Sequence, residues 1–94
     1  MPARKIEWIE YSSRYRRSFR KLPPDIQKKA RGREAVFAAH AFDPRLKTHK
    51  LHGIFQDYWA YSVDGTYRVI FRFISITEAL FFDIGRHAIY GGAE

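Results

Sequence analysis

Hydrophobic residues gather in three short runs in the last third of the chain, between Asp57 and Tyr90. The runs are rich in Val, Ile, Phe, Tyr and Trp, and turn residues separate them: Asp64-Gly65 after the first run and residues 75–78 after the second. Apolar runs of this length between turn residues are typical of β-strands. The pattern predicts a three-stranded antiparallel meander, around which the rest of the chain is organised.

The dipeptide Asp64-Gly65 suits a two-residue type I′ hairpin, in which both central residues take positive φ. That turn fixes the register of the hairpin and places Tyr61 opposite Arg68. Opposed residues share a face, so one face should carry Trp59, Tyr61, Arg68, Ile70 and Arg72. The other face is almost free of charge and should form the core, with Tyr58, Ala60, Tyr67, Val69, Phe71 and Phe73.

The start of the chain predicts one strand and one helix. Residues 5–11 alternate imperfectly between apolar and polar side chains, as expected of a strand that joins the later sheet. Ser12 or Ser13 can cap a helix, because a serine hydroxyl accepts a hydrogen bond from an unpaired N–H of the first turn. The buried stripe of this helix would be Tyr15, Phe19 and Leu22, and Pro23 would end it.

A second helix is predicted from Pro24 to about Phe42. Pro24 suits its first position, where the missing N–H costs nothing. The two helices would form an antiparallel pair on the uncharged face of the sheet. We therefore expect an α+β fold in a single domain over residues 1–94. An N-terminal strand, a helical hairpin and the meander would give a mainly antiparallel four-stranded sheet packed on two helices.

Composition narrows the classes of function. Seventeen Lys and Arg against ten Asp and Glu give a net charge of +7. This excess favours a polyanionic partner such as RNA, DNA or an acidic protein, although it could serve solubility alone. Without cysteine there is no disulfide and no thiol catalysis, which fits a reducing cytoplasm. The chain shows no apolar run of membrane-spanning length and no secretory signal, so we expect a cytoplasmic protein without membrane contact.

Three histidines in the middle of the chain have different interpretations. His40 lies near the predicted C-terminus of a helix, where a structural role is expected. His49 and His52 have the spacing of a metal pair, but no clear third ligand accompanies them, so no metal site is predicted. Alternatively, they line a groove that binds an anion, with Lys47 and Lys50 nearby.

The end of the meander carries further candidates. His87 directly follows the last strand, and histidine is the usual proton-transfer group near neutral pH. Arg68 and Arg72 lie in a strand, where the planar guanidinium suits phosphate. Arg72 could instead pair with Asp83 of the adjacent strand. Three aromatic residues could stack on bases or simply pack: Trp59, Tyr61 and Tyr90.

Together these residues predict a basic sheet face surrounded by His49, His52, Arg68, His87 and Tyr90. RNA cleavage without a metal needs a base for the 2′-hydroxyl proton, cations for the charged phosphorane, and an acid for the leaving 5′-oxygen. The residue types suit this chemistry, and no cofactor is implied.

The order of these segments resembles the RelE/ParE superfamily of type II toxins. The resemblance covers almost the whole chain: a strand, two basic helices joined at Leu22-Pro23, and the segments Leu46–Gly53, Asp57–Ala60, Tyr67–Phe71 and Phe82–His87. It implies a mainly antiparallel sheet on a helical hairpin and a protein antitoxin that wraps the toxin. Operator DNA would be bound only through that complex. For the RelE branch it implies ribosome-dependent, metal-independent cleavage of mRNA at the A site.

The resemblance also assigns roles to residues. Arg68 matches a strand arginine that contacts phosphate, and His87 falls where a catalytic His or Arg follows the last strand. His49 matches a histidine of the YafQ-like branch, and Tyr90 resembles a C-terminal aromatic that positions the scissile nucleotide. These four are the predicted catalytic residues. The predicted RNA-binding residues are Lys47, Lys50, His52, Tyr61, Arg72 and Arg86.

The chain departs from the RelE pattern at two places. Trp59 and Tyr61 replace the paired strand lysines, and Ala88 follows His87 where Asp is common. The leading hypothesis is an mRNA endonuclease toxin. The alternative is a ParE-like inhibitor of DNA gyrase with the same fold and no nuclease activity, and a third possibility is a catalytically silent member that only binds its antitoxin.

Overall fold

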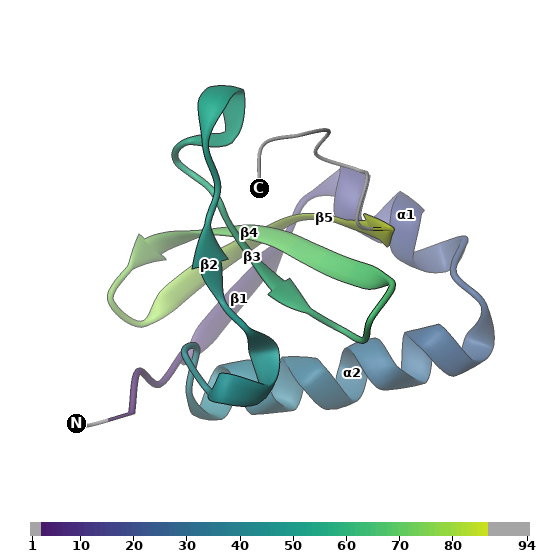
Figure 1. The fold of residues 1–94 in the computed structure, drawn as a ribbon, viewed down its shortest axis with the longest axis horizontal. Helices are drawn as coiled ribbons and strands as arrows, with labels where there is room; N and C mark the ends of the chain where they lie inside the picture. Colours follow the sequence, from purple (N-terminus) through teal and green to yellow (C-terminus); the bar gives the residue numbers. More distant parts are fainter. Residues whose placement is uncertain (1–2, 87–94) are drawn as a thin grey trace.

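The fold consists of two helices and one sheet (Figure 1), and the computed structural model describes residues 3–86. In chain order the elements are β1 (Trp8–Tyr11), α1 (Ser13–Arg20), α2 (Pro24–Ala39), the 3₁₀ turn η1 (Pro44–Leu46), β2 (His49–Lys50), the 3₁₀ turn η2 (Gly53–Phe55), β3 (Trp59–Ser62), β4 (Tyr67–Ser75) and β5 (Glu78–Arg86). None of the helices in this range is long and apolar enough to span a bilayer.

The sheet has the order β1-β5-β4-β3-β2. Among the described strands, β1 runs parallel to its neighbour β5, and the other pairs are antiparallel. The predicted α+β class, helical hairpin and meander are confirmed. Over residues 3–86 the sheet has five strands rather than the four predicted, because the segment between η1 and η2 adds β2. In this strand His49 pairs with Ala60, and Lys50 with Trp59. Figure 1 shows the connection between β2 and β3 projecting beyond the other strands.

Helix α1 begins as predicted. The Ser12 hydroxyl accepts from the Tyr15 N–H at 2.9 Å, and the same hydroxyl donates to the Phe82 carbonyl at 2.6 Å. The Tyr15 side chain is buried, and Phe19 and Leu22 pack against the core. A single serine thus starts the helix and attaches it to β5.

Helix α2 starts at Pro24, as predicted, but ends at Ala39 rather than near Phe42. The backbone of His40 is extended, with φ −162°, and its Nδ1 accepts from the Arg4 N–H at 3.0 Å. The expected structural role of His40 is therefore confirmed. Ala41 is buried in the segment that follows the helix, where its N–H donates to the Arg4 carbonyl at 2.9 Å.

The predicted register of the β3–β4 hairpin is wrong by one residue. Tyr61 lies opposite Val69, and Ser62 lies opposite Arg68. The loop has three residues instead of two, because the Asp64 carboxylate accepts from the N–H groups of Thr66 and Tyr67, at 2.8 Å each. Neither Asp64 nor Gly65 takes the positive φ that a type I′ turn requires.

This shift exchanges the two faces of β3 and leaves those of β4 as predicted. Tyr61 and Trp59 belong to the core beneath the helices, whereas Ala60 and Tyr58 belong to a smaller cluster on the opposite face, with Ile70. The helix-side core is largely aromatic: the Phe37 ring lies 5.1 Å from that of Tyr61 and 4.7 Å from that of Phe71. Aromatic packing between α2 and the sheet therefore positions both strands.

Candidate functional site

The sheet face opposite the helices carries the two strand arginines. On β4, Val69, Phe71 and Phe73 pack into the helix-side core, so the alternate residues Arg68 and Arg72 point to the other side. This is the face that the sequence predicted for both. Arg68 pairs with Ser62 of β3 on one side and with Gly85 of β5 on the other. Arg72 pairs with Leu80 of β5.

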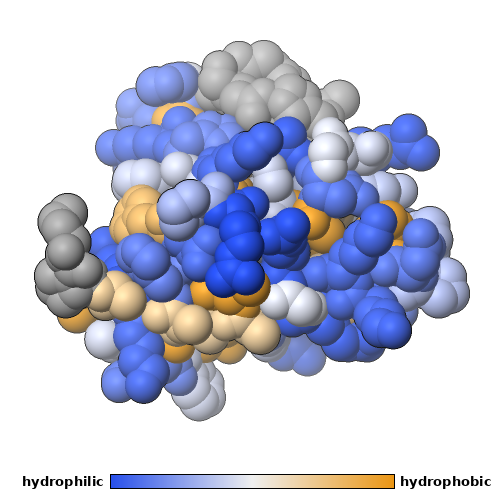
Figure 2. Space-filling view, turned by 60° about the horizontal axis from the view of Figure 1, so that its bottom comes forward, coloured by the Kyte–Doolittle hydropathy of each residue, from blue (hydrophilic) through white to orange (hydrophobic). Residues whose placement is uncertain are grey.

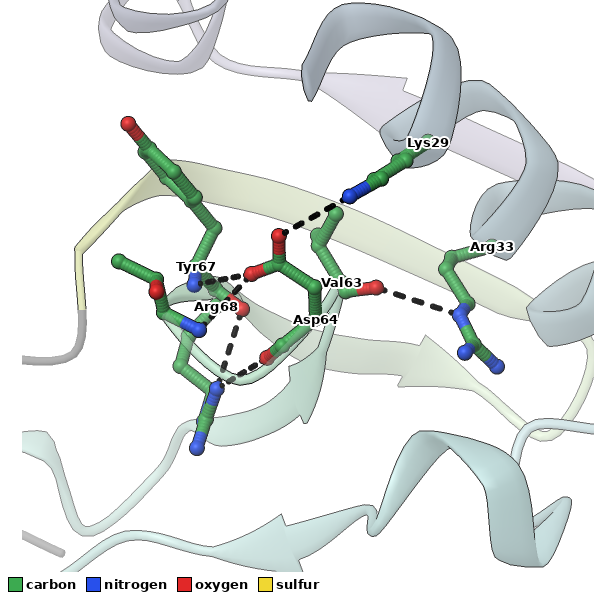
Figure 3. Close-up of polar contacts among 7 residues, drawn as sticks. Lys29, Arg33, Val63, Asp64, Tyr67 and Arg68 are labelled. Atoms are coloured by element: carbon green, nitrogen blue, oxygen red, sulfur yellow. Dashed lines mark hydrogen bonds and ion pairs between the residues drawn. The ribbon is translucent and has the colours of Figure 1, made fainter. Parts of the chain in front are cut away.

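Arg68 is anchored to the hairpin turn (Figure 3). Its Nη1 donates to the Asp64 carbonyl at 2.8 Å and to the Tyr67 carbonyl at 3.2 Å. Its Nε and Nη2 make no hydrogen bond to any described residue. The turn thus fixes the guanidinium through one nitrogen, and the remaining donors suit an anion on this face.

Arg72 does not pair with Asp83, the alternative partner considered from the sequence. Asp83 lies opposite Ile70, and its Oδ2 is 3.2 Å from the Nε of Arg14 in α1. Its Oδ1 accepts from the Ile84 N–H at 2.9 Å. Within residues 3–86, Arg72 is exposed and makes no hydrogen bond or ion pair, so its charge is available to a ligand.

His49 shares the face of the arginines. It lies opposite Ala60, which in turn lies opposite Ile70, and residues paired in this way point to the same side of a sheet. The His49 Nδ1 is 2.9 Å from the Lys47 carbonyl. Because a carbonyl only accepts, Nδ1 carries the proton, and in the neutral ring Nε2 carries the lone pair. In this tautomer Nε2 is the atom that can accept a proton, and it is buried in the structure.

The other predicted site residues lie in different places. Lys47 and His52 are exposed caps of the two 3₁₀ turns, while Lys50 is exposed at the sheet edge opposite Trp59. Arg86 ends β5, with its guanidinium 5.9 Å from the centre of the Tyr67 ring. Tyr61 is 0% exposed, so the hairpin register leaves no ring surface on which a base could stack. His87 and Tyr90 lie outside the described residues.

Two basic residues near the hairpin turn were not singled out from the sequence. Lys29 and Arg33 of α2 extend toward the turn (Figure 3): the Lys29 Nζ is 3.8 Å from an Asp64 carboxylate oxygen, and the Arg33 Nε donates to the Val63 carbonyl at 3.2 Å. Their spacing of four places them on one helix face. The sequence showed that shared face but not which part of the sheet it meets.

Asp64 is the anion at the centre of these contacts. Burial alone would raise the pKa of its carboxyl, but the N–H groups of Tyr67 and Thr66 lower it. The charges of Lys29 and Arg68 add to that effect, so the pKa of Asp64 lies below its ordinary value. Asp64 therefore remains a carboxylate near neutral pH and holds the surrounding cations in place.

The part of the chain that the structure describes contains no group of three or more His, Cys, Asp or Glu side chains placed to hold a metal ion. What it brings together is the guanidinium groups of Arg68 and Arg72 and the imidazole of His49 on one sheet face, with Lys47 at its border. This arrangement can bind a phosphate and offers one imidazole for proton transfer.

No protein-family model matches the chain, and no curated protein matches it. Several solved structures are similar to the chain. A YoeB/ParE toxin from Agrobacterium tumefaciens is 13% identical with a TM-score of 0.73, over 86% of this chain and 99% of that one. A mutant of YafQ from E. coli is 18% identical with a TM-score of 0.72, over 94% and 100%.

The third comparison is with RelE in the archaeal RelE–RelB complex from Pyrococcus horikoshii, which is 14% identical with a TM-score of 0.68, over 95% of this chain and 99% of that one. These three structures cover the helical hairpin and the sheet together. At such low identity they establish the arrangement of the backbone, which is the one that the sequence resemblance implied. The chain has the RelE/ParE-like toxin fold.

Proposed function

We propose that this chain is the toxin of a type II toxin–antitoxin system and that it cleaves mRNA on the ribosome, without a metal. The observation that carries the proposal is the placement of His49 and Arg68 on one sheet face, each fixed by a hydrogen bond to a backbone carbonyl. The shared fold with YoeB, YafQ and RelE toxins supports it.

In the proposed reaction the 2′-hydroxyl oxygen attacks the adjacent phosphorus while a base takes its proton. The bond from phosphorus to the 5′-oxygen breaks, and an acid protonates that leaving oxygen. The products are a 2′,3′-cyclic phosphate and a free 5′-hydroxyl. His49 or His87 would act as base or acid, and the guanidinium of Arg68 would stabilise the phosphorane charge. Arg72 and Lys47 would hold flanking phosphates.

We also propose a protein antitoxin as the partner. Two of the similar structures are complexes of this kind: RelE with RelB from Pyrococcus horikoshii, and DinJ with YafQ from E. coli. An antitoxin that covers the face of Arg68 and His49 would block the proposed chemistry. Operator DNA would be contacted only through that complex, in the cytoplasm.

A second candidate function is inhibition of DNA gyrase without nuclease activity. The name of the Agrobacterium toxin includes ParE, the branch for which gyrase is the expected target. The two functions separate in cells, because a nuclease stops protein synthesis first, whereas a gyrase inhibitor first causes DNA damage.

The experiment is primer extension on a reporter mRNA after brief induction of the toxin. We expect discrete new 5′ ends within the translated frame for the wild type, and their loss in His49→Ala, His87→Ala and Arg68→Ala. Arg17→Ala, an exposed change on α1, is the control and should keep the cleavage pattern. Growth arrest without new ends would contradict the nuclease and favour gyrase.

A further inference from the structure

A groove runs between α2, η1 and the β3–β4 turn, and it adjoins the face of His49 at Arg68 and Lys47. It consists of two adjoining hollows of about 510 and 190 Å³, which share Arg33, Arg45 and Asp64 in their walls. We call it the α2–hairpin groove. Figure 2 shows the side of the molecule on which α2 lies, where hydrophilic side chains cover most of the surface and hydrophobic surface gathers toward the lower left.

Five cationic side chains line this groove: Lys29, Arg33, Arg45, Lys47 and Arg68. Two carboxylates oppose them. Asp64 contacts Lys29, and Asp43 accepts from Arg45 through both of its oxygens, at 2.9 and 3.0 Å. The cations therefore outnumber the anions, and the groove is suited to an added negative charge.

Backbone contacts fix two of the cations without using all their donors. Arg33 holds the Val63 carbonyl through Nε, and Arg68 holds the turn carbonyls through Nη1. The other nitrogens of both guanidinium groups make no hydrogen bond to the described residues. A planar guanidinium fixed along one edge presents its remaining N–H groups in the geometry that suits phosphate oxygens.

We propose that the α2–hairpin groove binds the ribose-phosphate backbone of an RNA strand, independently of base sequence. The inference rests on the proposed function, because Arg68 belongs to both sites. A strand whose scissile phosphate meets Arg68 continues past Lys47 and Arg45 toward Arg33 and Lys29 on α2. These side chains contact phosphates several nucleotides away from the cleaved bond.

The lining favours RNA over an acidic protein segment. The apolar walls are small, formed by Val36, Val63 and the bare backbone of Gly32, and no aromatic residue lines either hollow. Protein partners usually insert a large apolar or aromatic anchor side chain into an apolar pocket. The two hollows of this groove offer no such pocket. Phosphate contacts need only positive charge and N–H donors.

Gly32 allows a test at a position where an added Cβ has open space. A Cβ built at this position meets no heavy atom within 4 Å apart from its own helical turn and chain neighbours, and the backbone is ordinary helix. Gly32→Glu places a carboxylate at the groove, and Gly32→Gln places a side chain of the same shape without charge. Arg20→Gln on α1 matches the change in net charge away from the groove. Circular dichroism melting checks that all three variants fold.

The probe is a fluorescent single-stranded RNA of about 12 nucleotides, 2′-O-methylated so that it cannot be cleaved, with binding followed by anisotropy. We expect Gly32→Glu to raise the Kd about fivefold relative to Gly32→Gln at low salt, and the difference to shrink as salt screens it. Arg20→Gln should change the Kd by less than about twofold. In the double variant Lys29→Gln/Arg45→Gln, the plot of log association constant against log salt concentration should be less steep, by roughly one unit of slope.

Three results would overturn the inference. If the wild type cleaves mRNA and binds the probe but Gly32→Glu and Gly32→Gln bind it equally, the groove does not hold RNA, and the proposed nuclease stands. If Gly32→Glu weakens only the binding of the antitoxin, the groove takes an acidic protein. If the wild type neither binds the probe nor cleaves mRNA in the primer-extension experiment, the groove inference and the proposed function both fail.

Discussion

The Nε of Arg14 lies 3.2 Å from the Oδ2 of Asp83 and joins the first turn of α1 to β5. The two side chains differ in exposure: that of Arg14 is 62% exposed and that of Asp83 is 11% exposed. The Arg14 guanidinium also lies 5.5 Å from the centre of the Phe82 ring. Asp83 is therefore neutralised by α1 and not by its strand neighbour Arg72.

Arg14 and Arg72 should consequently differ in their effects. Arg14→Gln should lower the free energy of unfolding by about 1 kcal/mol, because it leaves a mostly buried carboxylate with less compensation. Arg72→Gln should change it by less than about 0.5 kcal/mol but should weaken RNA binding. Urea unfolding and RNA anisotropy measure the two effects. Equal destabilisation by both substitutions would show that Arg72 also supports Asp83.

The cap at Ser12 gives a second prediction. Its hydroxyl makes two hydrogen bonds, one that starts α1 and one to the Phe82 carbonyl. Ser12→Ala should lower the free energy of unfolding by about 1 to 2 kcal/mol. Ser13→Ala, one residue later at an exposed helical position, is the matched control and should be nearly neutral. Equal effects in urea unfolding would argue against the assigned cap.

Asp64 predicts how stability depends on pH. Its folded pKa lies below the unfolded value of 3.8, so its contribution is fully present above that value and is lost as the pH falls through the folded pKa. Asp64→Asn keeps an oxygen for the turn N–H groups but removes the charge near Lys29. The variant should melt below the wild type at neutral pH, and the difference should shrink toward about pH 3. A difference that stays constant between the two pH values would contradict the assignment.

Local signals in the sequence were sufficient for most of the fold. Ser12, Pro23 and Pro24 act within their own segments, so the helix starts and the break between the helices could be placed. The hairpin register could not be predicted in the same way. Asp64 can serve either as a turn residue with positive φ or as a residue whose side chain closes a longer loop. The one additional loop residue shifts the register and places Tyr61 and Trp59 in the core and not on the predicted RNA face.

Some residues of the candidate site could likewise be placed from the sequence, and others could not. Arg68 and Arg72 could be placed on one face from the alternation of β4 alone. The contacts of Lys29 and Arg33 with the hairpin depend on how α2 lies over the sheet, which has no signature in the sequence beyond their shared helix face. The α2–hairpin groove is therefore a product of packing, and only the structure reveals it.

Tyr61 provides a direct test of the corrected register. Its side chain is completely buried among Phe37, Phe71 and Phe81, and its hydroxyl has no hydrogen-bond partner among the described residues. Burying an unpaired hydroxyl is unfavourable. Tyr61→Phe should therefore keep or raise the free energy of unfolding, by up to about 1 kcal/mol, and leave RNA binding unchanged.

The contrasting variant is Tyr11→Phe, which removes the hydrogen bond from the Tyr11 hydroxyl to the Glu34 carboxylate. It should lower the free energy of unfolding by about 1 kcal/mol. Urea unfolding of both variants separates a hydroxyl that is buried without a hydrogen bond from one that is hydrogen-bonded. A loss of stability in Tyr61→Phe as large as that in Tyr11→Phe would contradict the unpaired burial of the Tyr61 hydroxyl and the three-residue loop that produces it.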